Sequence, residues 1–197
     1  MSVRKAILAA ASLALAVACG GGSNTNFAAG TASVTGTVGG QPVSARDAIS
    51  AVVTIDSATS EALVLITNAQ NQCNRLNARQ ATMNGQALAF TLGVQSGTTV
   101  APPTVGTYQI FTLSAGASKI GNVAAALFGT TNPSCGTPSA PVEGNSGTVV
   151  LTNVSASGYT GTLDIIFIGG DHLTGSFTTA TCAPLTNPSP NTSCVPP

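Results

Sequence analysis

The sequence predicts an all-β protein, an antiparallel β-sandwich of about eight or nine short strands. Many short segments alternate between apolar and polar residues, and Gly, Asn and Ser dominate the segments between them. No long segment has the periodicity of an amphipathic helix. An open β-barrel is the alternative, because barrels share this strand pattern. The irregular segments 95–106 and 128–146 favour the sandwich, since a closed barrel typically has longer strands of even spacing.

The first strands are predicted to form two β-hairpins, one that reverses at Gly39-Gly40 and one that reverses at residues 57–60. The four strands concerned are residues 31–38, 41–48, 51–56 and 61–67. The last of these contains consecutive apolar residues from Leu63 to Ile66, which is typical of a central strand buried on both faces.

The middle of the chain is less regular. Residues 68–84 are polar, and a short helix is expected only there. Alternation returns over residues 86–94, and Pro102-Pro103 interrupts it. Further strands are predicted at residues 106–111 and 123–128.

Three strands, residues 148–154, 159–168 and 173–181, follow with short turns between them and predict an antiparallel meander. The β-domain is therefore expected to span residues 31–182. The tail, residues 183–197, is too rich in proline to be a central strand. It contains Cys194, so we expect a disulfide to hold the tail over a sheet edge.

The N-terminus has the three-part pattern of an export signal. Arg4 and Lys5 precede an apolar run, and small residues stand immediately before Cys19. The run is shorter than the roughly 20 residues that a membrane-spanning helix needs, so residues 1–18 are expected to be removed. Residues 19–30 are then a flexible tether rich in Gly, Ser, Asn and Ala.

The junction from Leu15 to Cys19 resembles the bacterial lipoprotein signal, or lipobox, with Ala16 where that family favours Leu. The resemblance implies that the Cys19 thiol is acylated and anchors the protein in a membrane. It also implies sorting to the outer membrane, because Gly20 stands where an Asp would favour the inner membrane. An ordinary cleaved signal, with Cys19 paired to another cysteine, is the alternative.

Beyond Cys19 an even set of four cysteines remains, and an exported chain is expected to oxidise them into two disulfides. Three connectivities are open. The favoured one joins Cys73 to Cys182, both just past the ends of predicted strands, and Cys135 to Cys194, both in Pro-rich irregular segments.

The charge pattern argues against nucleic acid as a partner. After the signal, the basic residues are Arg46, Arg75, Arg79 and Lys119, scattered along the chain and outnumbered by acids. Nucleic-acid binding needs clustered Lys and Arg to neutralise several phosphates. Only 6% of the residues are charged, so the surface should be mostly Ser, Thr, Asn, Gln and Gly.

Candidate catalytic residues are few. His172 is the only histidine and follows Asp171, but neighbours in a turn point to opposite sides, so a polar turn is the preferred interpretation. The segment Gly144 to Thr148 resembles a nucleophile elbow but lacks its second glycine. One histidine and scattered acids do not predict a zinc or calcium site, and no cofactor is expected.

These observations favour a non-enzymatic, lipid-anchored envelope protein with a structural or protein-interaction role. Its layout of lipobox, glycine tether and β-domain resembles that of small Gram-negative envelope lipoproteins. The alternative is a module that binds polysaccharide or a small apolar molecule, which predicts a pocket lined by Tyr108 and Tyr159. A third hypothesis, an envelope hydrolase, requires two carboxyl groups at catalytic distance.

Overall fold

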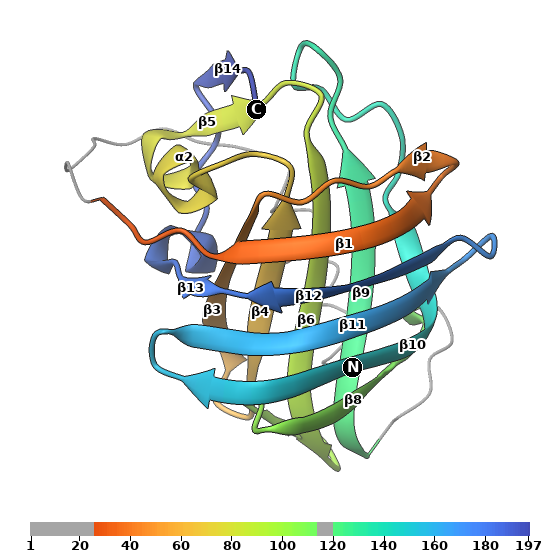
Figure 1. The fold of residues 1–197 in the computed structure, drawn as a ribbon. Coiled ribbons are helices and arrows are strands. Elements are labelled where there is room, and N and C mark those ends of the chain that lie inside the picture. The colour runs from red at the N-terminus through yellow and green to blue at the C-terminus, as the bar shows by residue number, and fades with distance from the viewer. Residues whose placement is uncertain (1–25, 114–119) are drawn as a thin grey trace.

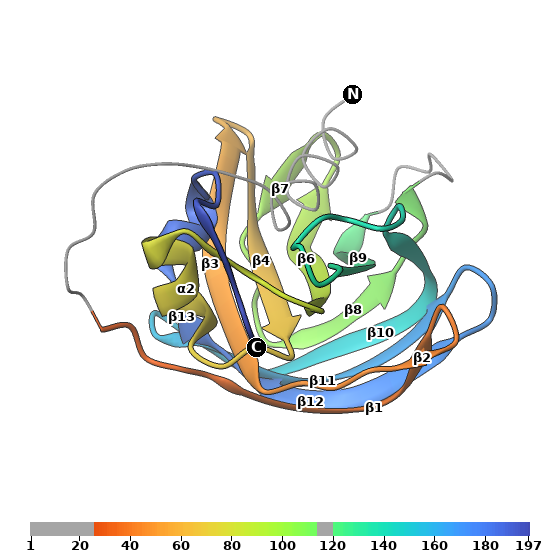
Figure 2. The same ribbon diagram turned by 90° about the horizontal axis from the view of Figure 1, so that it is seen from above.

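The computed structural model describes residues 26–113 and 120–197. The expected signal peptide, the expected acylation site Cys19, and Lys119 lie outside the described residues. In the described part, twelve strands form one mixed sheet that is strongly curled into a half-barrel (Figures 1 and 2).

The strands of this sheet are β1 (Thr31–Val38), β2 (Gln41–Pro42), β3 (Asp47–Asp56), β4 (Thr59–Thr67), β6 (Gln86–Ser96), β7 (Thr99–Ala101), β8 (Gly106–Ile110), β9 (Gly121–Thr130), β10 (Val142–Ser155), β11 (Gly158–Phe167), β12 (His172–Thr178) and β13 (Ala180–Thr181). A second, two-stranded sheet pairs β5 (Gln80–Thr82) with β14 (Ser193–Val195) in parallel. Two short helices complete the described fold, α2 (Gln72–Ala78) and the 3₁₀ helix η2 (Ala183–Thr186).

The large sheet folds over on itself into two layers. In Figure 1, β3, β4, β6 and β9 run across the direction of β10, β11, β12 and β1. Most neighbours are antiparallel, and β8 lies between β9, to which it is parallel, and β10. Inward-facing side chains of both layers fill the space between them, and the rings of Phe90 and Phe177 meet edge to face at 5.4 Å.

The sandwich of eight or nine strands predicted from the sequence is wrong, although the mostly β content is confirmed. A single sheet continues from one layer to the other through β10, which pairs with β8, β9 and β11. Its register against β11 shifts between Gly144 and Ser146, and a bulge of this kind bends a strand and increases its twist. The sheet therefore curls and does not split into two sheets. This curl is closer to the open barrel, the alternative fold predicted from the sequence.

Several local predictions are confirmed. The short helix within residues 68–84 is α2, β4 is buried along nearly its whole length, and β10, β11 and β12 form the predicted meander. The hairpin over residues 31–48 is mostly wrong, because β2 has two residues and β1 pairs along its length with β12. Local alternation does not specify that distant partner.

The C-terminal tail lies elsewhere than predicted. The edge of the large sheet at β3 is paired by β13, which precedes the tail, and β14 pairs with β5. Within the tail, η2 packs against β3 and buries Leu185 in a small cluster on the outer side of the sheet.

Candidate functional site

The space between the two layers holds no pocket formed by the tyrosines. Tyr108 is fully buried, and its hydroxyl donates to the Thr104 carbonyl at 2.6 Å and accepts from the Thr104 N–H at 2.7 Å. Tyr159 is buried in the same cluster, where desolvation raises its pKa and the nearby Tyr108 adds to the shift. Both tyrosines are core residues, and the predicted pocket lined by them is not formed.

Two hollows lie near α2. One is a cavity of about 50 Å³ beneath the helix, lined in part by Leu65, Leu76 and Ala87. It has room for little more than water molecules, whereas typical small-molecule sites measure about 300–1,000 Å³. The other is an open polar groove of about 410 Å³, bordered by Asn74 and Arg75.

The only histidine is not paired with its sequence neighbour. His172 Nε2 lies 2.9 Å from Asp164 Oδ1 on the adjacent strand β11, and both side chains are more than half exposed. Asp171 instead accepts hydrogen bonds from Thr37 Oγ1 (2.8 Å) and the Gly39 N–H (2.7 Å). The bond from Thr37 is the main reason why the pKa of Asp171 is lowered. The His172–Asp164 pair is open to solvent and has the character of a surface ion pair.

The segment that resembled a nucleophile elbow belongs to β10. Gly147 has a φ of +119°, and a Cβ there would lie 2.0 Å from the Asp164 carbonyl oxygen. The glycine is thus needed for close approach of β11 at the bulged end of β10. Among residues 26–113 and 120–197, no group of three His, Cys, Asp or Glu residues could hold a metal ion.

Glu61 is the most perturbed acid of the described chain, and the sequence analysis did not single it out. It lies in β4 with 4% of its surface exposed, opposite Val53 of β3. Desolvation raises its pKa to about 7, opposed in part by a hydrogen bond with Thr91. The sequence feature that could have identified Glu61 is a single acidic residue in a strand predicted to be buried on both faces. Desolvation, and not a second carboxyl group, is the cause of the raised pKa.

The layer formed by β1, β11 and β12 presents a broad hydroxyl face to solvent. Inward-facing residues of these strands, such as Val34, Leu163 and Phe177, pack in the core, so the alternate residues point outward. These outward residues form rows across the three strands. We name as the hydroxyl face Thr31, Ser33 and Thr35, with Thr178, Ser176 and Thr174 opposite them, and Thr160 and Thr162 on β11.

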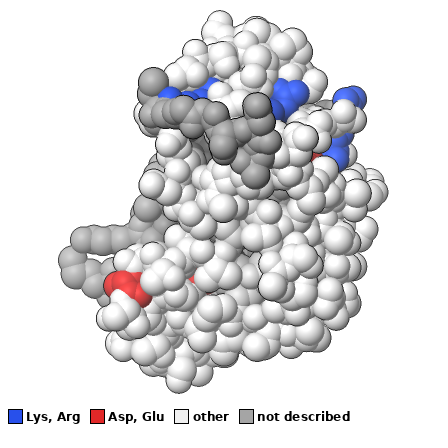
Figure 3. Space-filling model, turned by 90° about the vertical axis from the view of Figure 1, so that its left-hand side faces the viewer, with Lys and Arg blue, Asp and Glu red and all other residues white. Residues whose placement is uncertain are grey.

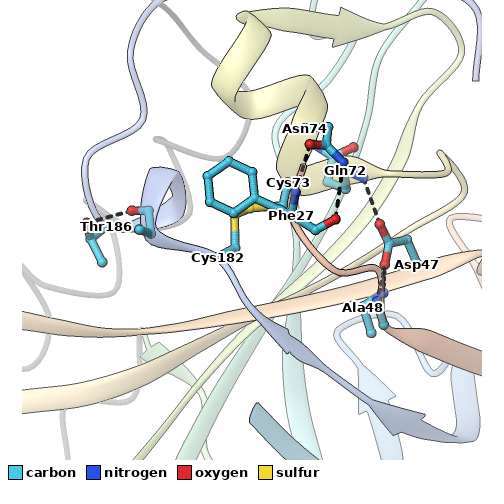
Figure 4. The surroundings of a disulfide bond; sticks show 10 residues. Phe27, Asp47, Ala48, Gln72, Cys73, Asn74, Cys182 and Thr186 are labelled. Atoms are coloured by element: carbon cyan, nitrogen blue, oxygen red, sulfur yellow. Dashed lines mark hydrogen bonds between the residues drawn. A yellow bond between two sulfur atoms is a disulfide. The ribbon is translucent and has the colours of Figure 1, made fainter. Parts of the chain in front are cut away.

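The other layer is covered on its outer side by α2 and the tail (Figure 4). Cys73 in α2 is bonded to Cys182, and Cys135 is bonded to Cys194, which are the two pairs favoured from the sequence. The carboxylate of Asp47, 1% exposed, accepts backbone N–H groups from Gly30 (2.9 Å), Ala48 (2.8 Å) and Gln72 (2.7 Å). This buried carboxylate therefore joins three segments that are distant in the sequence.

One end of the covered layer carries all the arginines of the described part. Arg46 precedes β3 and bonds through its backbone N–H to Thr67 at the end of β4, while Arg75 and Arg79 lie in α2 and at its C-terminal cap. We call this region the arginine end. Figure 3 shows the basic atoms near the top of this side of the molecule and the largest acidic patch near the bottom.

Comparison of the chain with protein-family models, curated proteins and solved structures gave no significant match. No helix of the described part is both long enough and apolar enough to cross a membrane.

Proposed function

We propose that the protein is anchored by lipid on Cys19 in the bacterial outer membrane and has a non-enzymatic, structural or protein-interaction role. The observation that carries the proposal is the pairing of the cysteines. Four of the five cysteines form two disulfides, which leaves Cys19, at the junction that resembles a lipobox, for acylation. Disulfides of this kind persist in oxidising compartments outside the cytoplasm.

The interaction role is supported by where the polar groups lie. The space between the layers is filled mainly with apolar side chains, and the exposed His172–Asp164 pair lines neither of the two hollows near α2. The hydroxyl face, in contrast, is broad and bears few charges. Its hydroxyl groups can supply the direct and water-bridged hydrogen bonds that a typical protein interface contains.

Intact mass spectrometry tests the anchor, and site-specific photocrosslinking tests the interaction role. Intact mass measurement of the detergent-extracted protein should give a chain that begins at Cys19 and carries fatty acyl groups. A photoreactive residue in place of Thr162 should then capture an envelope protein in intact cells, and the same residue in place of the exposed Val105 is the control.

An unacylated Cys19 would overturn the anchor. Capture of polysaccharide alone at position 162 would favour the glycan-binding alternative. Equal capture at positions 162 and 105, or none at either, would overturn the interaction role of the hydroxyl face.

A further inference from the structure

The chain from the anchor enters the folded domain beside α2. The Phe27 N–H donates to Asn74 Oδ1 at 3.0 Å, and Asn74 Nδ2 donates to the Phe27 carbonyl at 3.3 Å. The Phe27 side chain packs next to the disulfide of Cys73, as Figure 4 shows. Phe27 and Gly30, which belong to the segment 19–30 predicted as a flexible tether, are therefore bound to the domain, and the chain toward Cys19 leaves the domain at Phe27.

The tether is short compared with the domain. From Cys19 to Phe27 an extended chain spans less than about 30 Å. A domain of this length has a radius of gyration of about 15 Å and is therefore about 40 Å across. An anchor at Cys19 thus keeps the α2 side of the domain near the lipid. The tether is too short for the domain to turn over and bring the β3–β4 turn at Asp56 to the bilayer.

The charge of the described chain matches this orientation. The arginine end lies on the tether side, and the segments that surround it, residues 26–46, 68–86, 131–141 and 183–197, contain no acidic residue. Two acids adjoin these segments: Asp47 is buried and bonded to three backbone N–H groups, and the partly exposed Asp171 bonds to Thr37 and Gly39 at the end of β1 away from the tether. At the opposite end, Asp56 is exposed and no basic residue occurs between positions 48 and 67.

We propose that the arginine end rests on the phosphate headgroups of the bilayer that holds the anchor. The inference depends on the proposed lipid anchor and adds an orientation and a ligand class to it. Arg46 is exposed, and Arg75 borders the open polar groove. Bonds from Arg75 to the carbonyls of Gln70 (2.9 Å) and Pro196 (2.7 Å) hold this guanidinium in place. A planar guanidinium fixed in this way is suited to a phosphate.

The test uses the full acylated protein in vesicles. Amide hydrogen exchange is measured in vesicles of phosphatidylcholine alone and in vesicles that also contain phosphatidylglycerol. The exposed Arg46 and the partly exposed Arg75, together on an anionic surface, should favour the docked state by at most about 30-fold. Exchange in residues 72–78 and 192–195 should therefore slow in the anionic vesicles, and exchange in residues 56–59 should not change. Added salt should reduce the difference.

Three variants separate charge from structure. The double variant Arg46→Gln, Arg75→Gln should lose the slowing that depends on anionic lipid. Arg46→Lys, Arg75→Lys keeps the charge and should retain it. Ser57→Asp, Thr98→Asp makes the same change in net charge on exposed turns at the far end, and it should also retain the slowing.

Equal exchange in both vesicles, or protection of residues 56–59 in place of 72–78, would overturn the orientation. Intact mass distinguishes this failure from failure of the anchor. If Cys19 proves unacylated, the anchor is lost, and exchange with and without added anionic vesicles still decides whether the arginine end recognises phosphate.

Discussion

The two layers of the curled sheet differ in what covers their outer faces. Along β11 in the open layer, burial alternates residue by residue, because only one face packs against the core. Along β4 in the covered layer, nearly every residue is buried, because α2, η2 and the Cys73–Cys182 disulfide lie over the outer face. The open layer should therefore tolerate substitution, whereas the covered layer should depend on the contacts that hold its cover in place.

The cover of the outer face, formed by α2, η2 and the Cys73–Cys182 disulfide, is held by a few contacts between residues that are distant in the sequence. The outer cluster joins Ile49, Leu63 and Leu65 of the sheet to Cys73 and to Leu185 of the tail. Its bonds link segments up to 109 residues apart in the sequence. Loss of one of these links should therefore expose apolar surface well beyond the altered residue.

The largest effect is expected for the buried disulfide. Replacement of Cys73 and Cys182 by alanine should lower the free energy of unfolding by about 5 kcal/mol, because a long loop is released and a buried contact is lost. Replacement of Cys135 and Cys194, which close a shorter loop of 59 residues and are partly exposed, should cost about 4 kcal/mol. Denaturant titration compares the two, and equal losses would contradict a special role for the cover.

A slightly smaller effect is expected at Asp47. The variant Asp47→Ala leaves the N–H groups of Gly30, Ala48 and Gln72 buried without their acceptor, at about 1–3 kcal/mol for each unsatisfied group. Partial relaxation should reduce the total to about 4 kcal/mol in the free energy of unfolding. The control is Asp56→Ala on the exposed β3–β4 turn, where one bond to Ala58 is lost and about 1 kcal/mol is expected. Similar losses in the two variants would show that the three-way junction does not stabilise the fold.

Sequence patterns predicted those features that depend on neighbouring residues. The consecutive apolar residues from Leu63 to Ile66 predicted burial on both faces of β4, because either face of such a strand must leave water. The meander of β10 to β12 was also predicted from local pattern, because its strands alternate between apolar and polar residues and short polar turns separate them.

The missed features depend on distant partners. The pairing of Thr31 with Thr178 in β1 and β12 has no local signature, and neither does the junction at Asp47. The curl of the sheet was missed because segment 128–146 is irregular in its sequence pattern and therefore favoured a sandwich, whereas its last residues begin β10 and include the bulge near Ser146. The partner of His172 was also missed, since Asp164 lies on the neighbouring strand.

The effect of replacing Glu61 on the free energy of unfolding should depend on pH. Its pKa of about 7 in the folded protein is above the usual 4.5, so the fold favours the protonated acid. Glu61 therefore causes no loss of stability below about pH 4.5, and its penalty grows as the pH rises to about 7. Glu61→Gln should stabilise the protein by about 2–3 kcal/mol at pH 8 and by almost nothing at pH 4. Denaturant titrations at the two pH values test this, and an equal gain at both would contradict the raised pKa.

The smallest effect is expected in the open layer. His172→Ala removes a pair with Asp164 in which both side chains are more than half exposed, and such pairs contribute about 0–1 kcal/mol. The free energy of unfolding and the crosslinking pattern at position 162 should therefore stay close to those of the unaltered protein. The matched change in the covered layer, Leu63→Ala, removes a side chain that is 4% exposed and should cost about 2–5 kcal/mol. If the histidine variant lost as much stability as the leucine variant, solvent exposure would not be what distinguishes the two layers, and the pair would need a structural role that its open position does not explain.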